Sequence, residues 1–258
     1  MIRVGRNTAW HGGSMTIQQL SHARLWEEIF TKVASVRGPV LTFGVQYIEL
    51  PRYVVGRSAS AIARRMITTG DAHRLPVDYT ECGDLTELLL GRGADEAVCL
   101  DLFDTKAKLR HDMNKPIPEA EHGRYRTLID IGSLEHIFDT RQCVENCIRL
   151  LAVGGWYLLH VPVNGYFGHG IHVFNPLALL SALRLNGCEV RYTAYTTIGG
   201  RRIRRPGGNR DQLMWLAAEK VAELDTFTPP QQDGWDGLYE AGDYPHRRKI
   251  EKYGAGVT

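Results

Sequence analysis

Four short apolar runs, separated by segments with helical patterning, limit most strongly what this chain can fold into. The runs are too continuous for strands that expose one face to water, and they are typical of parallel strands covered on both faces. Their order therefore predicts an α/β fold in which a mostly parallel sheet lies between two layers of helices. The four runs are residues 40–43, 96–100, 127–131 and 157–161.

Capping and turn residues complete the expected elements. Ser14 is a candidate cap for a first helix, and Asp84 is one for a leucine-rich helix. Gly154 and Gly155 are expected to turn the chain into its fifth strand, and two late strands without a long helix between them favour an antiparallel hairpin at one edge. The expected helices span residues 14–36, 84–90 and 176–185, a weak third strand spans 107–111, and the late strands span 189–197 and 212–217.

The chain is predicted to hold one main domain with additions. An N-terminal arm and helix cover residues 1–37, and the domain covers 38–221. An insertion of about residues 47–83 follows the first strand and contains a basic helical piece. Residues 222–258 form a tail broken by proline and glycine, in which Trp235 and Tyr239 could fold back over the sheet.

Composition and charge favour a soluble cytoplasmic protein that acts on small molecules. The 258 residues are 43% hydrophobic and 23% charged, and the net charge of +2 argues against nucleic acid or an anionic membrane as partner. No apolar run approaches the ~18 residues of a membrane span. The five cysteines lack a C-x-x-C pair, which is typical of buried thiols in a reducing compartment. A homodimer is left open.

Polar residues that follow the predicted strands are the candidates for a ligand site, because ligands of open α/β sheets bind beyond the carboxyl ends of the strands. Asp101 follows the second strand, where a carboxylate can accept hydrogen bonds from both hydroxyls of a ribose, although it could equally cap a turn. Asp112 and Met113 follow the third strand. A carboxylate can bind the amine of adenine, and a thioether can pack on its ring.

Three segments carry a resemblance to a known family. RHDMNKPIP begins at Arg110, IDIGSLEHIF at Ile129 and GHGIHVFNP at Gly168. Together with the Gly154 and Gly155 pair, they resemble class I S-adenosylmethionine-dependent methyltransferases of small molecules, over roughly residues 38–220. The resemblance implies a Rossmann-like, seven-stranded, mostly parallel sheet with helices on both faces. It also implies S-adenosylmethionine as cofactor, bound by Phe43, Gly44, Gln46, Asp101, Leu102, Asp112, Met113, Ile131 and Gly132.

The loop after the first strand departs from that family. The family pattern is acid-x-Gly-x-Gly-x-Gly, whose missing side chains let the backbone approach the cofactor. This chain has TFGVQYI from Thr42, with Gly44 as its single glycine. Two interpretations stay open. Gln46 and the insertion could replace the glycine turn, or the fold could have kept its scaffold and lost the cofactor.

Histidines near the fourth and fifth strands are the candidates for catalysis. His136 is the expected general base, since imidazole titrates near neutral pH, and Glu135 would orient it. A glycine-bordered loop carries the candidate substrate residues, which are Asn164, Tyr166, His169 and His172. Glu135, His136 and His172 could instead hold a divalent metal, but Gly132 stands where related metal sites have a further glutamate, so no metal is expected. Structural roles for these histidines are the alternative.

The favoured function is methyl transfer to an oxygen or nitrogen of a small polar metabolite, such as a sugar or an intermediate of secondary-metabolite biosynthesis. One alternative is a methyltransferase-like binding or scaffold protein without activity. Another is different chemistry on an adenosine- or sugar-bearing ligand, with the basic run 201–205 as an anion clamp, although that run could also be a solvated turn. A nicotinamide dehydrogenase is disfavoured because no G-x-G-x-x-G follows a strand.

Overall fold

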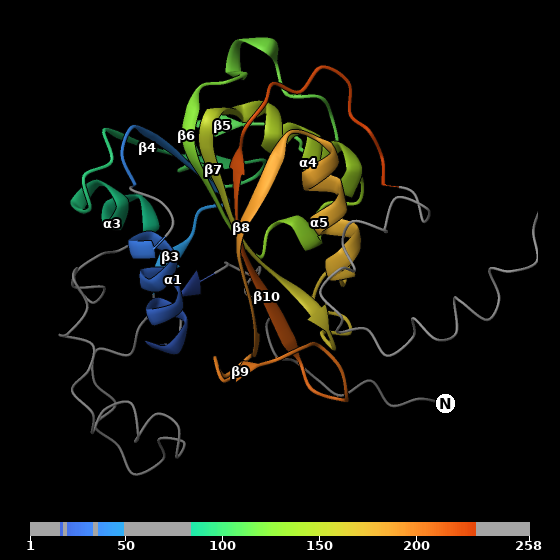
Figure 1. Cartoon of the computed structure of the whole chain (residues 1–258). Helices are drawn as coiled ribbons and strands as arrows, with labels where there is room; N and C mark the ends of the chain where they lie inside the picture. The colour runs from blue at the N-terminus through green and yellow to red at the C-terminus, as the bar shows by residue number, and fades with distance from the viewer. Residues whose placement is uncertain (1–15, 18–19, 33–35, 49–83, 231–258) are drawn as a thin grey trace, which may run out of the picture.

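A single large sheet organises the computed structural model, which describes residues 16–17, 20–32, 36–48 and 84–230 (Figure 1). Within these residues the sheet has eight strands in the order β5-β4-β2-β6-β7-β10-β8-β9. Numbered along the chain without the short β1 and β3, the first five positions read 3-2-1-4-5, the order of doubly wound dinucleotide-binding folds. The expected Rossmann-like, mostly parallel sheet is thus confirmed, with one short strand more than the seven expected.

Five parallel strands form the first part of the sheet. The central pair is β2 (Pro39–Phe43) and β6 (Tyr125–Ile131), whose register places Phe43 beside Asp130. Outside β2 lie β4 (Glu96–Asp101) and the edge strand β5 (Leu109–Arg110), and outside β6 lies β7 (Leu151–Asn164). The strand order reverses between β2 and β6, so the crevice for a ligand opens beyond their carboxyl ends.

The expected antiparallel edge is confirmed. β10 (Gln212–Lys220) pairs antiparallel with both β7 and β8 (Cys188–Thr197), and it inserts between them. The two-residue strand β9 (Arg202–Ile203) extends this edge. The basic run that holds β9 therefore forms a short strand where a turn was expected.

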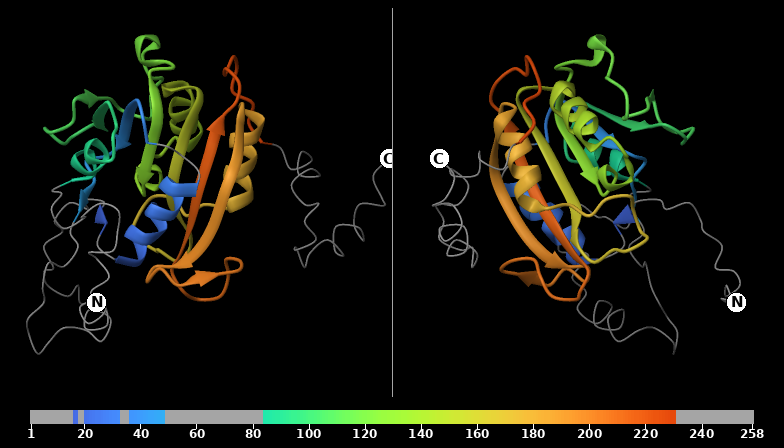
Figure 2. Two further views of the ribbon diagram at one scale, coloured as in Figure 1. Left: turned by 60° about the vertical axis from the view of Figure 1, so that its left-hand side comes forward. Right: turned by 90° about the vertical axis from the view of Figure 1, so that its right-hand side faces the viewer.

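Helices cover both faces, as the views in Figure 2 show. On one face, α1 (Leu20–Lys32) and α3 (Leu85–Gly91) pack on β-strand residues such as Ile129 and Leu158. On the other, α4 (Thr140–Leu150) and α5 (Pro176–Leu185) pack on residues such as Leu128 and Leu159. Neighbouring strand residues point to opposite faces, so the continuous apolar runs are explained by burial on both sides.

Local capping chemistry sets the starts of the helices. Asp84 caps α3 by accepting the backbone N–H of Thr86 at 2.9 Å and of Glu87 at 3.1 Å, as expected. Asp139 caps α4 in the same way, through the N–H of Gln142. Proline at the first position of α5 has no N–H that would lack a partner there, and Asn175 caps the helix by accepting the N–H of Leu177.

Two expectations near the N-terminus and at the sheet edge are wrong in extent. The first helix does not begin after Ser14, because Thr16–Ile17 forms β1 and pairs in parallel with β3 (Tyr47–Ile48). It also ends before Val36, which lies outside α1. The edge strand β5 is two residues long and not five, since it pairs with β4 only at Leu109 and Arg110.

The expected glycine turn before the fifth strand is a bulge inside a longer strand. β7 already begins at Leu151, and its register with β6 shifts before Trp156. Gly154 has φ +77°. A Cβ on Gly155 would lie 2.8 Å from the Ala152 carbonyl oxygen, so only glycine lets the backbone pass there.

Some expectations fall outside the described residues. These are the cap Ser14, the basic helical piece of the insertion, Cys82, Trp235 and Tyr239. The four described cysteines are all buried and free, as expected for apolar packing (Cys99, Cys143, Cys147 and Cys188). Among the described helices, none is long and apolar enough to span a membrane.

Candidate functional site

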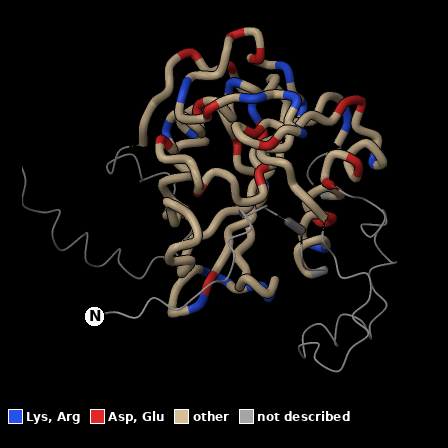
Figure 3. Tube along the Cα trace, turned by 180° about the vertical axis from the view of Figure 1, so that it is seen from behind, with Lys and Arg blue, Asp and Glu red and all other residues tan. Residues whose placement is uncertain are grey.

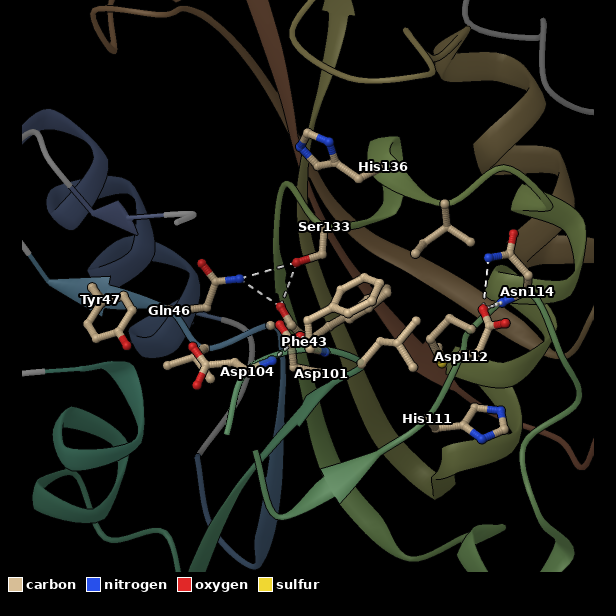
Figure 4. A pocket seen from close by; sticks show the side chains of 16 residues that line it. Phe43, Gln46, Tyr47, Asp101, Asp104, His111, Asp112, Asn114, Ser133 and His136 are labelled. Atoms are coloured by element: carbon tan, nitrogen blue, oxygen red, sulfur yellow. Dashed lines mark hydrogen bonds between the residues drawn. The ribbon is translucent and has the colours of Figure 1, made fainter. Parts of the chain in front are cut away.

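A cleft of about 700 Å³ lies at the carboxyl ends of β2, β4 and β6, where the strand order reverses. This volume is typical of a pocket for a small molecule or cofactor. Figure 4 shows its polar side chains, which come from the loops after these strands and after β5. The lining residues are Phe43, Gly44, Val45, Gln46, Tyr47, Asp101, Leu102, Phe103, Asp104, His111, Asp112, Met113, Asn114, Ser133, His136 and Ile137.

Asp101 lines the cleft and also holds its own loop. Its Oδ1 accepts the backbone N–H of Phe103 at 2.8 Å and of Asp104 at 3.0 Å. Both roles foreseen for this residue are therefore compatible, because one oxygen shapes the turn while the side chain still faces the cleft. Among the described residues, no hydrogen bond to its Oδ2 is recorded, so this oxygen can accept one from a ligand.

Asp112 and Met113, from the loop after β5, form a further wall of the cleft, and Figure 4 shows Asp112 beside Asn114. Two hydrogen bonds from Asn114, of 2.9 and 3.1 Å, reach Asp112 Oδ1 and lower the pKa of its carboxyl. Met113 is buried, and its carbonyl accepts a hydrogen bond from Asn146 of α4. This wall thus offers an ionised carboxylate next to a polarisable thioether.

The departure in the first loop has a clear structural consequence. Gln46 is only 1% exposed, and its Nε2 donates to the Phe43 carbonyl at 2.7 Å and to Ser133 Oγ at 3.3 Å (Figure 4). Ser133 Oγ donates to the same carbonyl at 2.7 Å. Gly44 has φ +82°, and its missing side chain leaves the space that Gln46 occupies. A glutamine side chain therefore bridges the crevice where the family pattern has glycine.

Two residues assigned to the cofactor do not line the cleft. Ile131 is buried in the core beneath α1, and Gly132, with φ +75°, only redirects the chain. The next residue, Ser133, faces the cleft instead. Its backbone N–H donates to Asp130, a fully buried carboxyl whose pKa is raised by desolvation to about 7.

His136 reaches the cleft, whereas Glu135 lies beneath it. Both belong to the short 3-10 helix η3 (Leu134–His136), which follows β6. Burial and the nearby His169 lower the pKa of the His136 imidazole, so it is neutral and able to accept a proton at neutral pH. Glu135 is 2% exposed, and its Oε2 has no hydrogen-bond partner. Burial, with Asp130 nearby, raises the pKa of Glu135 well above its usual value.

His169 and Tyr166 join this cluster from the loop after β7. The His169 ring lies 5.2 Å from the His136 ring and 5.3 Å from the Tyr166 ring. Its Nε2 is 4.0 Å from Glu135 Oε1. Tyr166 has the strained φ of 60°, and burial raises the pKa of its hydroxyl. Neither residue lines the cleft, but His169 lies between Tyr166 and His136, which does line it.

The other two substrate candidates hold loops. His172 Nε2 bonds to the Phe138 carbonyl at 3.1 Å, so this ring lies outside the His136 cluster. Asn164 donates from Nδ2 to the carbonyls of Gly208 and Arg210, at 3.1 and 2.7 Å. For His172 this contact corresponds to the structural alternative considered for the histidines.

Arg202 in the basic run pairs with Glu28 of α1 and donates to the Tyr192 hydroxyl. This places it in a surface network that joins α1 to the sheet edge.

Several lining residues were not identified from the sequence. Tyr47, Phe103, Asp104, His111, Asn114 and Ser133 all sit within three residues of an identified position. The feature that these residues share in the sequence is their place just after a strand, because each loop at the carboxyl edge of the sheet contributes more than one side chain to the cleft.

Comparisons with known proteins find similar solved structures but no related sequence. No protein-family model matches the chain, and no curated protein matches its sequence. Several solved structures are similar, all at low sequence identity. A candidate methyltransferase from Bacillus halodurans is 11% identical, with 78% of this chain and 100% of that chain covered and a TM-score of 0.47.

Two further structures carry more specific names. An S-adenosylmethionine-dependent methyltransferase from Mesorhizobium loti is 11% identical over 75% of this chain and 96% of its own, with a TM-score of 0.43. Geranyl diphosphate C-methyltransferase from Streptomyces coelicolor is 11% identical over 77% of each chain, with a TM-score of 0.41. Because all three TM-scores are below 0.5, the fold assignment rests on the strand order of the chain itself.

Proposed function

We propose that the protein transfers a methyl group from S-adenosylmethionine to an oxygen or nitrogen of a small polar metabolite. The observation that carries this proposal is the cleft at the reversal of strand order, with Asp101 and Asp112 at the ends of neighbouring strands. Two carboxylates and a thioether that line one cleft suit the hydroxyls and the amine of an adenosine. His136 at the same cleft suits an acceptor that must lose a proton.

The chemistry requires little of the protein beyond alignment and one proton transfer. The acceptor's lone pair forms a bond to the methyl carbon while the carbon–sulfur bond breaks, and S-adenosylhomocysteine leaves. A hydroxyl must lose its proton as it attacks, and a protonated amine must lose its proton before it can attack, so either acceptor needs a base. The neutral imidazole of His136 can take that proton, and Tyr166 and His169 beside it can position the acceptor.

The charge distribution supports a small-molecule acceptor. Acidic and basic residues are interspersed over much of the described chain (Figure 3), and the basic run 201–205 does not line the cleft. A nucleic-acid substrate would favour a basic stripe along the cleft. Instead the cleft wall carries three carboxylates, from Asp101, Asp104 and Asp112.

One observation favours the second candidate, a methyltransferase-like binding protein without activity. Gln46 bridges the ends of β2 and β6 through its bonds to Phe43 and Ser133, and so fills the crevice that a close-lying cofactor would use. If this bridge does not open, the scaffold is retained without cofactor. If it opens, the amide becomes available to the ligand.

Titration calorimetry with S-adenosylmethionine and S-adenosylhomocysteine separates the two. We expect micromolar affinity, about −8 kcal/mol, and a loss of at least tenfold in Asp101→Asn and Asp112→Asn. The matched control is Asp95→Asn, an exposed aspartate that precedes the amino end of β4 and lies outside the cleft. Absence of binding by folded wild-type protein, or equal affinity in all four proteins, would overturn the cofactor assignment.

The role of His136 is tested separately. His136→Ala should keep the affinity for S-adenosylhomocysteine within a few-fold and lower turnover by roughly 100-fold or more, the usual worth of a general base. Unchanged turnover in this variant, with any acceptor that the wild type methylates, would show that the base is another group.

A further inference from the structure

Three metal-ligating side chains from two separate loops converge beside the cleft. Glu135 and His136 come from η3 after β6, and His169 comes from the loop after β7. One ligand atom of each lies within 4.8 Å of the others, and Glu135 Oε1 is 4.0 Å from His169 Nε2. His169 is 33 positions from His136 and 34 from Glu135, so only the fold brings it to the other two.

The buried Glu135 carboxylate lies in this cluster with few groups that could stabilise its charge. It is 2% exposed, and its Oε2 makes no hydrogen bond. The one ion pair recorded for it among the described residues is the 4.0 Å approach of the His169 ring. A buried carboxylate without a partner is strongly unfavourable, and an unpaired acceptor in a native protein calls for an explanation. A bound cation supplies one.

The surrounding backbone is shaped around Glu135. Its carbonyl oxygen accepts the N–H of Ile171 at 2.8 Å and of His172 at 3.0 Å, which fastens the histidine loop to η3. A Cβ on Gly170 would lie 2.9 Å from Glu135 Cγ and 3.0 Å from its carbonyl oxygen. The loop can approach this closely only because residue 170 is glycine, and this approach presents His169.

We propose that Glu135, His136 and His169 bind one divalent transition-metal ion, such as Zn²⁺, Mn²⁺ or Fe²⁺. Two imidazoles and one carboxylate are the donors these ions prefer. Bonds of ~2.1 Å put neighbouring ligand atoms ~3.0–3.4 Å apart, so modest side-chain rotations from the present separations complete the site. His172, the third ligand considered from the sequence, is replaced by His169 because its ring bonds to Phe138.

The ion would keep free coordination positions toward the cleft, since the protein supplies three ligands. A hydroxyl or carboxylate of the acceptor can fill them, and a metal-bound hydroxyl loses its proton more readily than a free one. In the metal-loaded protein His136 would act as a ligand, and the proton of the bound hydroxyl would pass to solvent; in the metal-free protein His136 is the free base described above. Metal binding itself does not depend on the proposed methyl transfer, but this use of the metal does.

The test uses the full chain after chelation, titrated with Co²⁺ and followed by visible absorption and calorimetry. We expect one equivalent to bind with micromolar or tighter affinity, with Zn²⁺ competing for the site. Affinity should fall at least tenfold in Glu135→Gln and in His169→Asn. His172→Asn is the matched control, a histidine of the same loop outside the cluster, and should bind Co²⁺ like the wild type.

The outcomes are distinct. The proposal is overturned if the wild type binds neither Co²⁺ nor Zn²⁺. It is also overturned if Glu135→Gln and His169→Asn bind Co²⁺ as tightly as the wild type does. If Glu135→Gln fails to fold, the exposed His169→Asn still decides it. Titration of the same preparations with S-adenosylhomocysteine is independent, so protein that binds metal but no nucleoside refutes the proposed function and leaves the metal site standing.

Discussion

Ser133 Oγ donates a 2.7 Å hydrogen bond to the carbonyl oxygen of Phe43, which ties the carboxyl end of β6 to that of β2. Gln46 Nε2 donates to the same carbonyl at 2.7 Å. Two side chains, 87 positions apart, thus satisfy one buried acceptor at the reversal of strand order. This region, and the buried residues that hold it in place, can be tested by substitution.

The shared carbonyl predicts energetic coupling between Gln46 and Ser133. Each of Gln46→Ala and Ser133→Ala should lower the free energy of unfolding by about 1 kcal/mol. The double variant should lose about 0.5–1 kcal/mol more than the sum, because either side chain alone still satisfies Phe43. Urea unfolding of the four proteins measures the cycle. Additivity within ~0.3 kcal/mol would mean that the two bonds act independently.

Gly44 should tolerate a side chain less well than another glycine of similar backbone. Gly44→Ala places a Cβ 2.9 Å from Gln46 Nε2 and 3.0 Å from Ser133 Oγ, at φ +82°. The control is Gly123→Ala, at φ +65° with no atom within 4 Å. Left-handed strain alone costs about 1–2 kcal/mol, so both variants lose that much, and Gly44→Ala should lose measurably more. Equal thermal unfolding of the two would contradict the close approach.

Asp130 makes stability depend on pH. Burial raises the pKa of its carboxyl from 3.8 to about 7 in the folded protein, so the folded state holds a proton that the unfolded state releases. Its contribution is therefore fully present below pH ~4 and is lost as pH rises through 7, on the order of 4 kcal/mol in all. Asp130→Asn keeps an acceptor for the Ser133 N–H and offers a donor to the Tyr157 hydroxyl.

The measurement is urea unfolding of the wild type and Asp130→Asn at pH 5 and pH 8. We expect the wild type to lose more stability than the variant between these two values. Comparing the two proteins removes most of the contribution of Glu135, whose pKa is raised in the same direction mainly by burial and in part by Asp130 itself. An equal loss of stability in the two proteins between pH 5 and pH 8 would show that Asp130 is ionised in the folded protein at both values.

Asn146 of α4 should hold the wall of the cleft that carries Asp112. Its Nδ2 donates to the Lys115 carbonyl at 2.7 Å, and its Oδ1 accepts the Ile117 N–H at 3.0 Å. Asn146→Ala leaves these buried groups unpaired, so we expect a loss of roughly 2–4 kcal/mol.

Hydrogen exchange at the Ile117 amide reports the effect locally. It should quicken in Asn146→Ala by more than the global loss of stability explains. A matched control is Asn186→Ala, another buried asparagine, which bonds to Ala182 of α5 and to Thr228 in the segment after β10. Equal protection of Ile117 in both variants would show that the wall does not depend on Asn146.

Most of the fold was predictable from local pattern. Residues 176–185 and Asp84 were assigned correctly because proline, aspartate and apolar spacing act within one or two turns of chain. The first helix was overextended because Thr16–Ile17 pairs with β3, a contact 31 positions away that no local pattern reveals. The bulge at Gly155 was missed for the same reason, since it depends on the backbone of the neighbouring strand.

The candidate site also has features that local sequence determines and features that depend on tertiary contacts. The sequence by itself determined that Asp101, Asp112 and His136 follow parallel strands, and the periodicity of a buried sheet is enough to bring such residues to one edge. Only the tertiary structure decided that Gln46 bridges to Ser133, that His169 and not His172 joins Glu135, and that Ile131 is core. These three outcomes depend on the direction of side chains and on contacts between loops that are far apart in the sequence. Both are set only when separate segments of the chain pack together.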